Sequence, residues 1–260
     1  MIAPGFAEVE GQIWIWMLAM IRPGAAMVVA PIFGASNVPI QIRIILAFMI
    51  GMVATNTASF DLPSDTAISL SNSMFVIGEV LAGVAIGFAL QLGYSSVLIA
   101  GESISNSMGL GFASMSDPQT GQSTPVIGQF LSIFATLLLL AIDGHLMLLA
   151  TIVNSYSALP PGYAFLGADM FMGIVEFGGI LFSMGLLIAL PVGGALILIQ
   201  FIMGFLARTA PALNLFAVGI PVTIIGGLVA LAVTAPILAE TIVQSLGMGL
   251  DHAALIAGGR

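Results

Sequence analysis

The hydrophobic positions of this chain fall into six long runs, which are separated by shorter polar or glycine-rich segments. The runs span residues 12–31, 40–58, 74–100, 125–149, 170–207 and 213–242. A helix needs about 20 residues to cross a bilayer core of about 30 Å, and the run at 12–31 meets that length. The pattern therefore predicts an all-α integral membrane protein with about six hydrophobic elements.

Proline, glycine and serine mark the expected breaks between and within these runs. Pro191 lies inside a run that is too long for one simple span, so two helical pieces are expected there, and Pro221 and Pro236 should interrupt the last run. A frayed tail is expected after residue 249. Residues 102–124 are rich in Ser and Gly, so this segment is not expected to span the membrane. Gly83 and Gly87 form a small-xxx-small pair that allows helix backbones to approach closely.

The composition supports a single membrane domain over residues 1–260 and excludes several classes of function. Hydrophobic residues make up 59% of the chain and charged residues 6%, whereas soluble domains carry about 25% charged residues. The net charge of −8, with four Arg and no Lys, argues against binding to nucleic acid. There is no Cys, and no common catalytic or nucleotide-binding motif is present. We therefore expect neither an enzyme nor a cofactor.

Ionisable residues within apolar runs are the first functional candidates, because charge at membrane depth is unfavourable. Arg22 and Glu79 lie deepest in their runs and could pair, although the sequence alone cannot show contact. Glu102, Asp143 and Glu240 lie near predicted helix ends, so helix capping or pairing is the preferred interpretation of these three. A capped helix end with a hydrogen-bonded His is preferred over a metal site for Asp143 and His145. The full set is Arg22, Glu79, Glu102, Asp143, His145, Glu176 and Glu240.

Methionines outside the clear runs suggest a second kind of site. Most of the 15 Met residues suit helix packing, but Met108 and Met115 lie in the Ser/Gly-rich segment. Irregular backbone at membrane depth is tolerated only where it is buried in protein or lines a cavity. Residues 103–124 are therefore either an exposed loop or part of a pore, and composition leaves both open.

Four stretches resemble one family. They are RPGAAMVVAPIFGASNVPIQIR, AGESISNSMGLGFASMSDP, DGHLMLLATIVNSYSALP and ARTAPALNLFAVGIPVTIIGG, in that order along nearly the whole chain. The last contains the fairly specific pattern Arg-x-x-Pro-x-x-Asn-x-Phe-x-x-Gly-x-Pro. Together they resemble the FliR-like family of export-gate proteins in flagellar and virulence-associated type III secretion.

The resemblance implies a fold, a function and partners. Members of the family are built from bent and broken helical hairpins packed in a helical hetero-oligomeric assembly with FliP-like and FliQ-like subunits, and they associate with an FlhB-like subunit. The assembly lies in the bacterial inner membrane at the flagellar basal body and protrudes toward the periplasm. It passes unfolded substrate proteins across that membrane. We expect this chain to form part of such a channel.

The resemblance also assigns candidate residues. A loop of FliR-type subunits helps to plug the closed channel, and residues 108–118 match it here. The pore or plug candidates are Met108, Gly109, Gly111, Phe112, Met115, Asp117 and Pro118. The candidates for a structural or assembly role are Arg22, Pro31, Pro39, Arg43, Glu79, Arg208, Pro211, Asn214, Phe216, Gly219 and Pro221.

One alternative from another class remains at this stage. A secondary transporter of a small solute would use broken helices and buried carboxylates near the bilayer midplane. Glu79 and the expected break at Pro191 are its best support. A transporter should bind a small solute and lose uptake when Glu79 is neutralised, whereas an export-gate subunit should co-purify with other membrane proteins and be needed for filament assembly.

Overall fold

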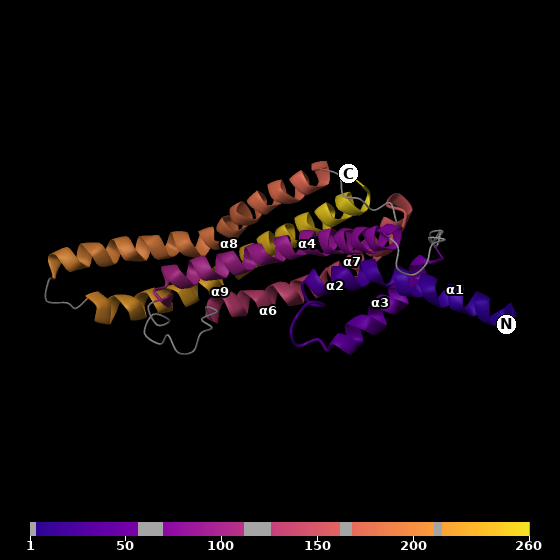
Figure 1. The fold of residues 1–260 in the computed structure, drawn as a ribbon. Helices are drawn as coiled ribbons and strands as arrows, with labels where there is room; N and C mark the ends of the chain where they lie inside the picture. The colour runs from indigo at the N-terminus through magenta and orange to yellow at the C-terminus, as the bar shows by residue number, and fades with distance from the viewer. Residues whose placement is uncertain (1–3, 57–69, 112–125, 162–167, 211–214, 260) are drawn as a thin grey trace. The chain divides into compact units, whose positions relative to one another are not determined.

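The computed structural model describes residues 4–56, 70–111, 126–161, 168–210 and 215–259. These residues form helices and contain no strand. The helices, labelled as in Figure 1, are α1 (Pro4–Ala19), α2 (Ile21–Val29), α3 (Ile40–Ala54), α4 (Leu70–Ser107), α6 (Val126–Ala141), α7 (Gly144–Ala158), α8 (Ala168–Thr209) and α9 (Leu215–Ala257). The expected all-α membrane fold is confirmed.

The six hydrophobic runs of the sequence correspond to six apolar elements of the structure. Four helical segments are long and apolar enough to cross a membrane, namely Gln12–Val29, Ser73–Ser107, Met172–Thr209 and Ala217–Ala257. The pair α6 and α7 would make a fifth, broken span, and α3 is a shorter apolar helix. The order and approximate positions of the six elements therefore agree with the hydrophobic pattern.

The two longest helices contradict the expected breaks. α8 continues through Pro191, and α9 continues through both Pro221 and Pro236 to Ala257. Each proline removes one backbone donor, but a break in an apolar environment would leave several more backbone groups without partners. The frayed tail is also wrong, since Ala253 and Ile256 are buried.

Two further boundaries differ from the pattern. α4 extends through the polar residues after Ala100 to Ser107, so the first part of the segment at 102–124 is helical. The run at 125–149 is divided into α6 and α7 by Asp143, whose backbone is in the left-handed region at φ 56°. Asp tolerates this region better than most residues do. Its carbonyl oxygen accepts hydrogen bonds from the N–H groups of Leu146 and Met147, at 2.9 and 3.0 Å.

The chain divides into two compact units, through both of which α4, α8 and α9 pass. Unit 1 comprises residues 1–93, 142–178 and 246–260, and unit 2 comprises residues 94–141 and 179–245. Each unit combines segments that are distant in the sequence, so neither can form from a local stretch alone.

Close helix packing in unit 1 depends on glycine. A Cβ added to Gly83 would clash with the carbonyl oxygen of Arg22, and one added to Gly87 would clash with that of Ala26. The predicted small-xxx-small pair therefore does bring α4 against α2. On α3, a Cβ on Gly51 would lie 2.8 Å from the backbone nitrogen of Met20. Such backbone contacts increase the dispersion attraction between helices, which is a main source of helix association in lipid.

Unit 2 has a glycine contact of the same kind and two polar links between helices. A Cβ on Gly101 of α4 would clash with the Cα of Gly128 on α6. The hydroxyl oxygens of Ser96 on α4 and Ser245 on α9 are 2.7 Å apart. The Tyr94 hydroxyl donates to the carbonyl oxygen of Ser132 at 2.9 Å. These contacts of α4 with α6 and α9 are thus made by small residues and hydroxyl groups rather than by charge.

Candidate functional site

The most conspicuous polar site in the described residues is a fully buried ion pair in unit 1. The guanidinium of Arg22, on α2, faces the carboxylate of Glu79, on α4, in a two-point arrangement. Its Nε donates to Oε2 and its Nη2 to Oε1, both at 2.9 Å. Both side chains have 0% exposure. The pairing that the sequence analysis raised is therefore present in the structure.

Residues of α7 and its C-cap residue, Leu159, complete the surroundings of the guanidinium. Nη1 donates to the hydroxyl oxygen of Ser155, and Nη2 also donates to the carbonyl oxygen of Leu159, each at 2.9 Å. The ring of Tyr156 lies beneath the guanidinium, with its centroid 4.0 Å from the Arg22 Cζ. The Tyr156 hydroxyl donates to the carbonyl oxygen of Ala19 at 2.8 Å. We call these residues the Arg22 cluster.

The Arg22 cluster joins four helices of unit 1. The Arg22 side chain links α2 to α4 and α7, and the Tyr156 hydroxyl links α7 to α1. A guanidinium has five N–H donors, and four of its hydrogen bonds are accounted for here. A buried ion pair adds little net stability over an apolar pair of equal shape, but removing one partner leaves an unpaired buried charge. The cluster therefore specifies which faces of α2, α4 and α7 meet, and it offers no free carboxylate for transport or catalysis.

A second site lies at the C-terminal end of α4, where the candidate pore segment begins. Gly109 has φ +82°, a conformation that favours glycine. The N–H of Gly109 donates to the carbonyl oxygen of Asn106, and the N–H of Leu110 to that of Ser105. This is a Schellman motif, which satisfies carbonyl groups at the end of a helix. The conformational freedom of Gly109 is thus used to end α4.

Side chains from two other helices of unit 2 hold this end of α4. Gln200 on α8 donates to the carbonyl oxygen of Ser107, and Thr223 on α9 donates to that of Met108, both at 3.0 Å. Met108 is fully buried, and a Cβ placed on Gly227 of α9 would lie 2.7 Å from its Cγ. In this chain Met108 therefore packs between helices of its own unit.

The remaining pore candidates are described only in part. Gly111 follows the Schellman motif, and a Cβ on it would lie 2.7 Å from the Asn106 side-chain oxygen. The other four candidates lie outside the described residues; they are Phe112, Met115, Asp117 and Pro118.

Arg43 stabilises the connection between α2 and α3. Its Nη2 donates to the carbonyl oxygens of Ala35 and Val38, at 2.5 and 3.0 Å. Pro39 occupies the N-cap position of α3, and Pro31 is buried just after α2. These residues of the first family-like stretch therefore shape one turn.

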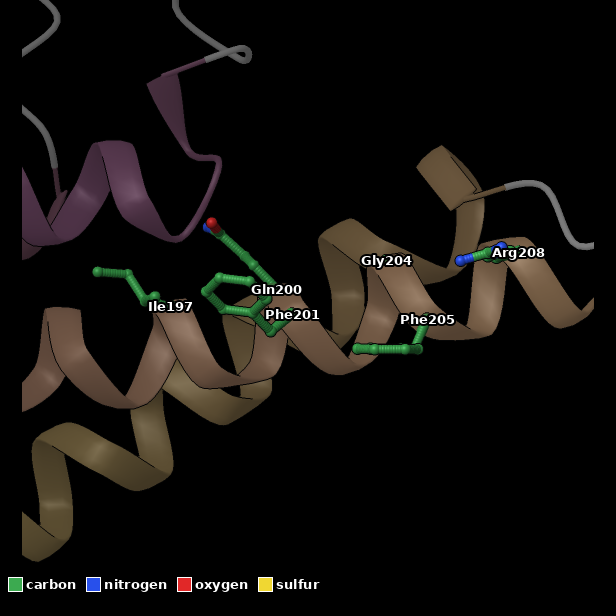
Figure 2. Close-up of a pocket in the computed structure, with 6 residues that line it drawn as sticks. All are labelled: Ile197, Gln200, Phe201, Gly204, Phe205 and Arg208. Atoms are coloured by element: carbon green, nitrogen blue, oxygen red, sulfur yellow. The ribbon is translucent and has the colours of Figure 1, made fainter.

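Arg208 lies in the last turn of α8, beside an open groove of about 450 Å³. Figure 2 shows its side chain lying back along the helix toward Gly204. The described residues supply no hydrogen-bond partner for the guanidinium of Arg208, so its structural or assembly role stays a prediction. Within the same pattern, Gly219 and Pro221 lie on α9, Pro211 and Asn214 lie outside the described residues, and the side chain of Phe216 is not among those described. The groove is lined by Ile197, Gln200, Phe201, Gly204, Phe205 and Arg208.

The other ionisable candidates form no charged cluster in the described part of the chain. Glu102 and Glu240 are exposed and lie within α4 and α9, so their expected places near helix ends are wrong for Glu240 and only approximate for Glu102. Asp143 starts α7 but makes no side-chain cap bond. Nδ1 of His145 has no partner among the described residues, so the hydrogen-bonded His that we expected is not seen at this atom. Glu176 is exposed.

Sequence reasoning missed the uncharged members of both sites. Ser155 and Tyr156 lie in the polar run Asn-Ser-Tyr-Ser that ends the apolar α7, and this run was a detectable signal. Gln200 and Thr223 stand alone in apolar surroundings, where a single amide or hydroxyl needs a partner. His252 lies in the part of the chain after residue 249 that was expected to fray, but it is on α9. Its ring stacks on Phe177 at 4.4 Å, and its Nε2 lies 3.1 Å from the carbonyl oxygen of Gly173.

The fold and these sites define an integral membrane protein with a rigid internal ion pair and wide apolar helix faces. Comparison with known proteins gives the family. The model of bacterial export proteins, family 1, matches residues 13–248, and the chain belongs to this family.

Curated relatives with the same name cover most of the chain. The flagellar biosynthetic protein FliR of Escherichia coli (strain K12) is 32% identical over 229 residues, which cover 88% of this chain and 86% of the relative. The FliR protein of Bacillus subtilis (strain 168) is 34% identical over 212 residues, with 80% and 81% covered. That of Pectobacterium carotovorum subsp. carotovorum is 33% identical over 220 residues, with 84% and 83% covered.

Proposed function

We propose that this chain, an inner-membrane subunit of the flagellar type III export apparatus, forms part of the wall of the export channel. Its neighbours would be FliP-like, FliQ-like and FlhB-like subunits at the flagellar basal body, with part of the assembly on the periplasmic side. The observation that carries this proposal is the family match over residues 13–248. Unfolded export substrates would pass through the channel, and the chain itself would perform no catalysis.

The exposed surface supports assembly with other membrane subunits. Unit 1 has an apolar groove of about 670 Å³ beside α1, α2 and α4, wide enough to receive side chains of another helix. In unit 2, α8 exposes a succession of large apolar side chains that lipid or partner helices must cover. They include Leu186, Leu190, Leu198, Ile202 and Phe205.

The transporter alternative is less well supported by the geometry. It needs a buried carboxylate that is free to bind an ion or a proton. Among the described residues Glu79 is the buried carboxylate, and both of its oxygens accept hydrogen bonds from Arg22. α8 also has no break at Pro191 where a solute could bind.

The first test deletes the gene for this chain and complements the deletion with the wild-type chain or its variants. Deletion of the gene should abolish filament assembly, and an affinity-tagged chain should co-purify with FliP-like and FliQ-like subunits. Glu79→Gln distinguishes an export-gate subunit from a transporter. A transporter would lose solute uptake while assembly stayed normal, whereas an export-gate subunit would lose assembly and export together. Normal filaments in the deletion strain would contradict the proposal.

For the gate, we propose that the segment after the Schellman motif, residues 111–118, contributes to the seal of the closed channel. Met115 and Phe112 would supply apolar contacts that exclude water and ions, and such contacts yield readily because each is weak. The end of α4, held by Gln200 and Thr223, would be the fixed base of this segment.

Deletion of residues 111–114 should therefore make cells leak ions and grow slowly in high salt, while the gate still assembles. The deletion leaves Gly109 and Leu110 in place, so the cap of α4 remains. The measurement is ion conductance across the inner membrane, with Thr223→Ser, which keeps the hydroxyl, as a matched control. Unchanged conductance with normal assembly would show that the segment is an exposed connector.

A further inference from the structure

The groove beside Arg208 lies on one face of α8. Its lining positions 197, 200, 201, 204, 205 and 208 recur at three- and four-residue intervals, the spacing of neighbours on a helix surface. Gly204 leaves a notch in this face because it has no side chain, and the space is open, since a Cβ placed there would meet nothing within 4 Å. Figure 2 shows the Arg208 guanidinium extending toward that notch.

Arg208 differs from the other arginines that the structure describes. Arg22 is held by a carboxylate, a hydroxyl and a carbonyl oxygen, and Arg43 is held by two carbonyl oxygens. Arg208 is exposed and has no such partner in the described part of the chain. A guanidinium beside apolar side chains in a membrane needs an external acceptor, because it cannot lose its charge.

The position of Arg208 along α8 indicates where that acceptor lies. Residues 177–207 contain no charged side chain, and the apolar stretch Met172–Thr209 exceeds the length of about 20 residues that crosses a bilayer core. An arginine near the end of an apolar membrane helix can reach the phosphates of the lipid headgroups with its long side chain. Planar guanidinium groups bind phosphate through two parallel hydrogen bonds.

We propose that this groove binds an anionic phospholipid. Arg208 holds the phosphate, and one acyl chain lies over Gly204 between Phe201 and Phe205, which are 67% and 69% exposed. The groove belongs to a single helix face and is shallow, which suits a flexible acyl chain better than a rigid partner helix. The chain carries a net charge of −8, so Arg208 is a local exception in a protein that otherwise repels anionic lipid.

The test uses the full-length chain in its membrane complex, purified in detergent and stripped of lipid. Dioleoylphosphatidylglycerol and dioleoylphosphatidylcholine are added separately, and retained lipid is counted by native mass spectrometry. The wild-type complex should retain phosphatidylglycerol in preference to phosphatidylcholine. Arg208→Gln should weaken retention of phosphatidylglycerol roughly tenfold, since a hydrogen bond to a charged group is lost. Inorganic phosphate should not displace the lipid.

A second variant tests the groove without touching the charge. Gly204→Leu fills the notch and should reduce retention of phosphatidylglycerol by a similar factor. Gly193→Leu is the matched control, because Gly193 is also on α8 and equally open, and it should retain lipid like the wild type. Equal retention of both lipids, or retention unaffected by Arg208→Gln and Gly204→Leu, would overturn the proposal. If both variants lost a partner subunit while lipid retention stayed unchanged, the proposal would also be overturned, and a carboxylate of a partner subunit would be the acceptor for Arg208.

Discussion

Replacement of Arg22 by Ala should be among the most damaging single changes in this protein. It would remove the positive charge that faces the buried Glu79 carboxylate, together with the hydrogen bonds that the guanidinium donates to the Ser155 hydroxyl and the Leu159 carbonyl. Breaking a buried pair from one side costs about 3–5 kcal/mol of stability. We expect a large fall in the thermal unfolding temperature of the purified complex, low levels of the chain in cells, and loss of motility.

A double-mutant cycle separates the contribution of the two charges from that of the side-chain packing. Arg22→Met and Glu79→Met should each be strongly destabilising, and the double variant should be less so than the sum of the two, because no unpaired charge remains. Arg22→Lys should rescue only partly, since an ammonium cannot reproduce the planar two-point contact with Glu79. Glu176→Gln, which changes an exposed carboxylate of the same unit, is the control and should be close to neutral. Additive losses in the cycle would show that the two residues do not act as a pair.

The depth of Arg22 and Glu79 could be recognised from the sequence, but the full cluster could not. The two residues are 57 positions apart, and Ser155 is 133 positions from Arg22. Hydrophobic periodicity reports the environment of a residue along its own helix and carries no information about which helix it faces. The resemblance to a family ordered the stretches along the chain, yet it named Arg22 and Glu79 without their hydroxyl and carbonyl partners.

The helix breaks were overpredicted for a reason specific to membranes. Prolines and polar residues end helices in water, where exposed backbone groups are hydrated. In α8 and α9 the apolar surroundings favour continued backbone hydrogen bonding through Pro191, Pro221 and Pro236. The polar residues at the end of α4 were excluded from the preceding span for the same reason, although the carbonyl groups of Ser107 and Met108 accept hydrogen bonds from side chains on α8 and α9. The break at Asp143, by contrast, has a local cause in one left-handed residue.

Glycine spacing was the most transferable of the sequence features. Gly83 and Gly87 are four residues apart, so they lie on one face of α4, and that face is the one packed on α2. Gly178 and Gly179 on α8 do not pack against another helix in the same way, because a Cβ on either of them would meet nothing within 4 Å in this chain. Small residues therefore predict that close approach is possible, and only the structure shows which of them achieve it.

Gly83→Ala should cause the second large loss of stability, and Gly179→Ala is its matched control. The new methyl group at Gly83 would overlap the Arg22 carbonyl oxygen and lie 2.9 Å from the Ala25 Cβ. Neither atom can rotate away, so α2 and α4 must separate. Overpacking of this kind lowers the free energy of unfolding by about 1–3 kcal/mol. The separation would also draw Arg22 away from Glu79, so the loss should approach that of Arg22→Ala. Gly179→Ala meets open space inside a helix and should stabilise the chain by up to about 1 kcal/mol.

Thermal unfolding of both variants in the purified complex measures the difference, with cellular level and motility as independent readouts. A combined variant adds a stricter check on the mechanism. If the separation of α2 from α4 acts through the ion pair, then Gly83→Ala should cost much less in the background of Arg22→Met and Glu79→Met, where no charges need to stay in contact. An equal cost in both backgrounds would mean that the helix contact and the ion pair stabilise unit 1 independently. Tolerance of Gly83→Ala in the wild-type background would contradict the close packing of these helices itself.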